Sequence, residues 1–217
     1  MDPIFEFMMR EKREKLRGYQ ILNQYVQKGQ TVFTGSSLIE QFPVCEFARN
    51  DNVSKIIYNR AIGGYTTVEL LAALKNCIFD LAPAKLFINI GTNDLNIEYF
   101  DAEKLAGQYA EILQQVRDRL PNVRLYMIAN FPMNETDDFG IPEAKLWFQY
   151  RSNKRIEAYN EQVRKLADRF AATYVDLNQN LIDHKGELKR EYSVEGIHIY
   201  ANGYHAIWND LLPFILE

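Results

Sequence analysis

The sequence predicts an α/β protein in three layers, with a parallel sheet of about five strands covered by helices on both faces. Short apolar runs alternate along the chain with segments of helical periodicity, as is typical of strands joined by crossover helices. The clearest run, Lys85–Ile90, is almost continuously apolar, which indicates a strand buried on both faces. With 217 residues, 47% hydrophobic and 25% charged, the chain suits a single domain over residues 1–217.

Strands and helices are expected to alternate after a leading helix within residues 1–28, whose periodic pattern begins at residue 4. The expected strands are Thr31–Thr34, Ser54–Asn59, Lys85–Ile90, Arg124–Ala129 and Thr173–Leu177. The later helical patterns cover Thr67–Cys77, Asp101–Leu120, Glu143–Phe170, which is long enough to break near Tyr150, and residues 203–217. In such sheets ligands bind outside the carboxyl ends of the strands, so functional residues are expected directly after strands.

Composition and charge exclude several classes of protein. The net charge of -4 argues against a general affinity for nucleic acid, and the basic residues between Arg10 and Arg17 alternate with glutamates, as on a solvated helix face. Cys45 and Cys77 are too few for a disulfide framework. Neither a secretory signal nor an apolar stretch long enough to cross a membrane stands out, so the cytoplasm is the expected location.

Three loops after predicted strands carry groups that acyl transfer could use. Ser37, in Thr34–Leu38, precedes a helix-like segment, whose free N–H groups would favour a developing anion, although a helix cap explains it as well. Gly64, in a glycine pair, can point a backbone N–H at a ligand or simply make a turn. Asn93 would offer a neutral side-chain donor, as an oxyanion hole requires, or bond its own backbone in a turn.

A histidine with a nearby acid follows close to the C-terminus. Glu195 lies three residues before His198, with a glycine between them. In a tight loop the carboxylate can hold the imidazole in one tautomer while the other ring nitrogen faces a serine. His184 and His205 have no acid at such a spacing beside a plausible site and are expected at the surface. Acyl transfer needs a nucleophile, a base held by an acid, and donors for the oxyanion. The serine, the histidine with its acid, the glycine N–H and the asparagine amide supply these groups.

The order of these motifs resembles the SGNH (GDSL-like) hydrolase family, and most of all its platelet-activating-factor acetylhydrolase-like and lysophospholipase-like branches. The resemblance spans residues 31–204. The matching blocks are Gly35-Ser36-Ser37-Leu38 for Gly-Asp-Ser-Leu, Ile62-Gly63-Gly64 for the glycine block, Gly91-Thr92-Asn93-Asp94 for the third block and Glu195-Gly196-Ile197-His198 for Asp-x-x-His. It implies a flavodoxin-like α/β/α sandwich and a carboxylic-ester hydrolase that uses a serine nucleophile, without metal or organic cofactor.

The resemblance implies a role for each residue. Ser37 would attack the acyl carbonyl, His198 would act as base and then as acid, and Glu195 would orient His198. The oxyanion would be held by the backbone N–H groups of Ser37 and Gly64 and by the Asn93 side chain.

Two positions depart from the family pattern. Ser36 stands where the family has aspartate, which leaves two adjacent serines, and the register of the motif favours Ser37. Glu195 stands where aspartate is usual and is one methylene longer. A Ser-His-Glu set is chemically sound, although in some members a backbone carbonyl holds the histidine instead.

The expected substrate is a small-molecule ester of a short acyl chain, acetyl included. Tyr65, Phe131 and Trp147 are predicted to line its site, and residues 134–150 form either a partial lid or core of the long helix. A lysophospholipase, a thioesterase and a carbohydrate O-acetyl esterase are alternatives that need the same residues. A non-catalytic ligand-binding domain is the alternative of another class. A flavodoxin-like FMN protein is disfavoured because Thr34–Leu38 has only one glycine.

Overall fold

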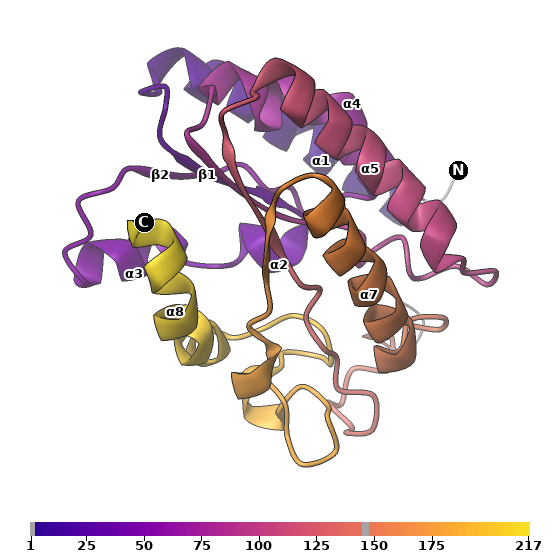
Figure 1. The fold of residues 1–217 in the computed structure, drawn as a ribbon. Helices are drawn as coiled ribbons and strands as arrows, with labels where there is room; N and C mark the ends of the chain where they lie inside the picture. Colours follow the sequence, from indigo (N-terminus) through magenta and orange to yellow (C-terminus); the bar gives the residue numbers. More distant parts are fainter. Residues whose placement is uncertain (1–2, 145–147) are drawn as a thin grey trace.

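The computed structural model describes residues 3–144 and 148–217, and it contains a five-stranded parallel sheet in the order β2-β1-β3-β4-β5 (Figure 1). The strands are β1 (Thr31–Gly35), β2 (Ile57–Asn59), β3 (Lys85–Asn89), β4 (Arg124–Ile128) and β5 (Thr173–Val175). The chain runs from β1 outward to β2 and then returns to the other side of β1, so the strand order reverses between β1 and β3. Ligand sites of open parallel sheets lie at such a reversal, at the carboxyl ends of the strands.

Helices cover both faces of this sheet, which confirms the predicted three-layer fold (Figure 1). One layer comprises α1 (Pro3–Leu22), α4 (Thr67–Cys77), α5 (Ala102–Arg119) and α7 (Asn153–Arg169). The other comprises α3 (Val44–Asn50) and α8 (Ala201–Leu216), while α2 (Ser37–Glu40) is a single turn directly after β1. Short 3-10 turns lie at Asn23–Tyr25, Phe79–Leu81, Asn178–Asn180 and Arg190–Tyr192.

An aromatic column ties the three central strands together. Phe33, Phe87 and Tyr126 occupy paired positions of β1, β3 and β4, and their rings stack at centroid distances of 4.4 Å and 4.5 Å. The Tyr126 ring also meets Phe214 of α8 edge to face, so the column faces the layer that contains α8. Stacked rings add to the apolar burial of the sheet and stabilise the packing between these strands.

Capping signals set several helix bounds. Helix α4 has the predicted bounds, with a capping box between Thr66 and Glu69, and α5 begins after Asp101, whose side chain accepts two backbone N–H bonds. The long pattern predicted over Glu143–Phe170 is interrupted near Tyr150, as expected: α7 begins at Asn153, where Ser152 caps it by accepting from the N–H of Arg155.

Other predicted bounds also needed correction. Helix α1 ends at Leu22 instead of continuing to residue 28, because a 3-10 turn follows and Gly29 takes a positive φ of 78°. Strand β2 begins at Ile57 rather than Ser54. The short helices α2 and α3 were not predicted, since four and seven residues are too few to show a helical period.

None of the helices in the described part of the chain combines the length and apolar character needed to span a bilayer.

Candidate active site

Three side chains that are distant in the sequence form a hydrogen-bonded row beyond the carboxyl end of β1. The Oγ of Ser37 lies 3.0 Å from Nε2 of His198, and Nδ1 of His198 lies 2.6 Å from Oε1 of Glu195. Glu195 is buried, with 5% of its surface exposed, whereas Ser37 and His198 are half-buried. The imidazole therefore stands between a reachable hydroxyl and a buried carboxylate, the geometry in which it can take a proton from the serine.

Glycine at the end of β1 positions Ser37. Gly35 has a φ of 148°, and a Cβ there would overlap the carbonyl oxygen of Asn89 on β3, so only glycine allows the turn at this close approach. The next two residues then point in different directions. The Ser36 hydroxyl is buried and has no hydrogen-bond partner among the described residues, whereas Ser37 opens α2 and faces His198.

A compact loop holds Glu195 against His198. The Val194 N–H donates to the carbonyl of His198 at 2.9 Å, and the Gly196 N–H donates to Oγ of Ser193 at 2.7 Å. Gly196 has a φ of 108°, and a Cβ there would lie 2.9 Å from the carbonyl oxygen of Asn134. The Glu195 carboxylate accepts from the backbone N–H of His198 at 3.1 Å as well as from its ring. The loop thus lets the longer glutamate side chain bond both the ring and the backbone N–H of His198.

Electrostatics keep this carboxylate ionised. Burial raises the pKa of Glu195, but the hydrogen bonds and the charge of His198 outweigh burial and leave that pKa below its ordinary value of 4.5. A fixed negative charge beside Nδ1 stabilises the imidazolium that forms when His198 accepts a proton.

Asn93 sits between the glycine loop and a half-buried arginine. Its Nδ2 donates to the carbonyl of Tyr65 at 2.9 Å, and its Oδ1 accepts from Nη2 of Arg151 at 3.3 Å. These two bonds fix the plane of the amide and use one of its two donor hydrogens. The second hydrogen is the one that could serve an oxyanion.

The glycine loop approaches Ser37 closely. A Cβ on Gly63 would lie 3.8 Å from Cβ of Ser37, and the neighbouring Gly64 takes a positive φ of 71°. The structure therefore brings together the groups predicted from four separate loops: Ser37, Gly64, Asn93 and His198 with Glu195.

The sequence did not reveal the part played by Lys12. It was predicted to be solvated, but its side chain is only 14% exposed and reaches from α1 onto the glycine loop. Its Nζ donates to the carbonyl of Gly64 at 2.7 Å and to Oε1 of Glu69 at 2.8 Å. No pattern in the sequence distinguishes Lys12 from its basic neighbours, because only the packing of α1 selects it.

Arg151 was also missed. Burial lowers the pKa of its guanidinium to about 10, while the charges of Glu195 and Asp94 act in the opposite direction. The side chain places a positive charge behind Asn93 and near Glu195. An arginine inside a predicted helical pattern carries no signal of this kind.

The rings predicted to line the substrate site are placed differently. Tyr65 is 4% exposed and Phe131 1% exposed, and both belong to the hydrophobic core. They offer a substrate almost no surface, which corrects the prediction, because both side chains pack into the hydrophobic core. Trp147 lies outside the described residues. His184 and His205 are exposed, as expected.

Comparison with known proteins identifies the family. Residues 41–206 match the model of the GDSL-like lipase/acylhydrolase family. The chain belongs to this family. The matched range begins just after Ser37 and contains Gly64, Asn93, Glu195 and His198. Membership makes the protein a carboxylic-ester hydrolase, and the predicted resemblance to SGNH hydrolases is confirmed.

Relatives of known structure or sequence agree with this assignment. The alpha1 subunit of platelet-activating factor acetylhydrolase IB from Bos taurus is 25% identical over 190 residues, which are 87% of this chain and 75% of that subunit. A structure from Streptococcus pneumonia, described as a platelet activating factor, superposes with a TM-score of 0.86 at 28% identity and covers 98% of this chain and 96% of its own. The acetyl xylan esterase AlAXEase shares the fold, with a TM-score of 0.68 at 15% identity over 85% of this chain and 99% of its own.

Proposed function

We propose that this chain is a serine esterase that hydrolyses esters of short acyl chains, acetyl included, with Ser37 as the nucleophile. The observation that carries the proposal is the hydrogen-bonded row from Ser37 through His198 to Glu195. A hydroxyl, an imidazole and a buried carboxylate in this order are the parts of an acyl-transfer site, whatever fold holds them.

In the first half-reaction Oγ of Ser37 forms a bond to the acyl carbon while its proton passes to Nε2 of His198. The tetrahedral intermediate then collapses, the ester C–O bond breaks, and the alcohol leaves with the proton from His198. In the second half-reaction water attacks the acyl-enzyme and gives a proton to His198. The bond from the acyl carbon to Ser37 breaks, the proton returns to Oγ, and the carboxylic acid is released.

Charge develops at two places, and the site offers a group for each. The imidazolium of His198 forms next to the ionised carboxylate of Glu195. The oxyanion would accept hydrogen bonds from the backbone N–H groups of Ser37 and Gly64 and from the remaining hydrogen on Nδ2 of Asn93. Donors held in place before the reaction stabilise the transition state more than the ground state.

The preference for short acyl groups draws support from the relatives. The bovine subunit is named as an acetylhydrolase, and AlAXEase is named as an acetyl xylan esterase. Both names describe removal of an acetyl group from an oxygen, and the same catalytic groups would serve that reaction here.

Covalent labelling combined with an ester panel tests the proposal. A fluorophosphonate probe should label the wild-type protein and should not label Ser37→Ala. p-Nitrophenyl acetate and butyrate, measured beside acetylated xylose, then separate a simple esterase from a carbohydrate O-acetyl esterase. A protein that binds esters but is neither labelled nor active would be a ligand-binding domain on this fold, and the proposal would fail.

A further inference from the structure

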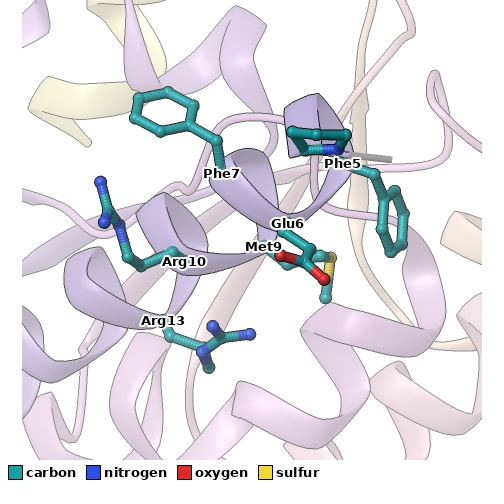
Figure 2. A pocket seen from close by; sticks show the side chains of 7 residues that line it. Phe5, Glu6, Phe7, Met9, Arg10 and Arg13 are labelled. Atoms are coloured by element: carbon teal, nitrogen blue, oxygen red, sulfur yellow. The ribbon is translucent and has the colours of Figure 1, made fainter. Parts of the chain in front are cut away.

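Helix α1 separates two hollows in the surface, and only one of them touches the candidate active site. The larger, of about 630 Å³, is lined by residues of α1 alone, among them Phe5, Met9, Arg10 and Arg13 (Figure 2). The smaller, of about 340 Å³, lies between α1 and the glycine loop. It is lined by Phe7, Met8, Ile62, Gly63 and Gly64 and by four charged residues, Glu11, Lys12, Lys15 and Glu40. We call this smaller hollow the α1 groove.

The α1 groove passes close to the nucleophile. Gly63 forms part of its wall, and a Cβ there would lie 3.8 Å from Cβ of Ser37. Glu40, another residue of the wall, belongs to the same single-turn helix as Ser37. Because glycine has no side chain, only the backbone of Gly63 and the Glu40 carboxylate, whose Oε2 would lie 2.7 Å from a Cβ on Gly63, stand between this end of the groove and Ser37.

The chemistry of the groove suits an apolar chain. Phe7 and Met8 are 54% and 51% exposed, so they leave apolar surface open to a ligand. The charged groups around the groove are largely paired: Lys12 with Glu69 at 2.8 Å, and Lys15 with Glu40 at 3.2 Å. The groove therefore combines apolar side chains with charged groups of which Lys12, Lys15 and Glu40 are paired.

The position of His198 indicates which half of an ester enters the groove. The leaving alcohol must receive a proton from Nε2 of His198, so the alcohol departs on the side of the histidine loop. Among the described residues that line the groove, none comes from the loop Ser193–Ile199 that carries His198. We infer that the α1 groove holds the acyl chain of the substrate, and that the enzyme prefers acyl chains longer than acetyl. This inference rests on the proposed function.

The test measures chain-length preference in matched variants. Wild-type kcat/KM for p-nitrophenyl esters should rise from acetate through butyrate to hexanoate, by up to about fourfold for each methylene group that becomes buried. Met8→Ala should lower the ratio of kcat/KM for hexanoate over acetate by about threefold or more. Met9→Ala is the control, because Met9 lies on the same helix but lines the other hollow, and it should keep the wild-type ratio.

A second variant fills the groove, whereas Met8→Ala empties it. Met8→Trp should fill the groove and lower the same ratio because long chains are excluded, and melting curves of all variants check that each one folds. Equal changes for every ester, or the same ratio in Met8→Ala as in Met9→Ala, would overturn the inference. The proposed function fails by a different result, namely no fluorophosphonate labelling of Ser37 in the wild-type protein.

Discussion

The Nζ of Lys12 donates a hydrogen bond to the carbonyl oxygen of Gly64 at 2.7 Å, which ties the first helix to the glycine loop beside Ser37. The same ammonium group pairs with Glu69, whose carboxylate also accepts from the N–H of Thr66 at 2.8 Å. One lysine thus holds both the glycine loop and the start of α4. The leading helix is therefore part of the support of the candidate oxyanion hole.

Replacing Lys12 should impair the chemical step. In Lys12→Met the Gly64 peptide loses its anchor, and kcat should fall about tenfold to a hundredfold with a smaller change in KM, because small displacements of catalytic groups are costly. Lys12→Arg should recover part of the loss. Lys75→Met, on α4, removes an exposed ion pair with Asp80 of the following 3-10 turn and should have little effect on either constant. Wild-type kcat in a folded Lys12→Met protein would contradict the positioning role.

The two adjacent serines should differ sharply. Ser37→Ala should remove nearly all esterase activity, whereas Ser36→Ala should keep most of it. The Ser36 hydroxyl is buried without a partner among the described residues, so its removal leaves no other polar group unpaired. Steady-state kinetics and fluorophosphonate labelling of both variants give the answer, and an inactive Ser36→Ala protein with a normal melting curve would reverse the assignment.

Asn93→Ala should lower kcat by about a hundredfold or more with a smaller effect on KM. The amide donates to charge that appears only in the transition state, so substrate binding depends on it less. The substitution also frees the carbonyl of Tyr65 and one hydrogen-bond donor of Arg151, so its melting temperature must be measured as well. An unchanged kcat, with chemistry rate-limiting, would assign Asn93 a structural role alone.

Glu195→Gln should reduce activity less than His198→Ala, because the amide keeps the shape of the carboxylate but cannot stabilise an imidazolium. Glu195→Asp should also lose activity, since the loop places the longer side chain in contact with both the ring and the backbone N–H of His198. Wild-type kinetics in Glu195→Gln would show that another group supports the histidine.

The lowered pKa of Glu195 also predicts a pH dependence of stability. Its carboxyl is more acidic in the folded chain than its ordinary value of 4.5, so the unfolded chain binds more protons as pH falls below that value. The stability that this ionised group contributes is complete well above that pH and is lost as pH falls through the folded pKa. Urea unfolding of wild type and Glu195→Gln should therefore show a difference in unfolding free energy at neutral pH that shrinks in acid. A difference that stays constant would mean that the carboxylate is not stabilised by folding.

The sequence alone determined the layers of the fold and the identity of the candidate chemical groups. The bounds of α4 were predictable because a capping box and a helical period are both local signals. The run Lys85–Ile90 predicted the buried strand β3 to within one residue, because a continuous apolar run is also a local signal. Ser37, Gly64, Asn93 and His198 could be found because parallel strands carry all their carboxyl ends to one edge, so loops that follow strands must meet there.

Only the tertiary structure decided which partner each side chain meets. Ser37 faces His198 while Ser36 is buried, and the sequence motif can only favour one of the two. Lys12 and Arg151 join the site because α1 and the segment before α7 pack against the glycine and asparagine loops, and no local pattern encodes that packing. Phe131 is buried in the core, and the packing that buries it is likewise not encoded by a local pattern. Local periodicity records whether a residue is buried, whereas the neighbour that buries it depends on contacts between elements far apart in the chain.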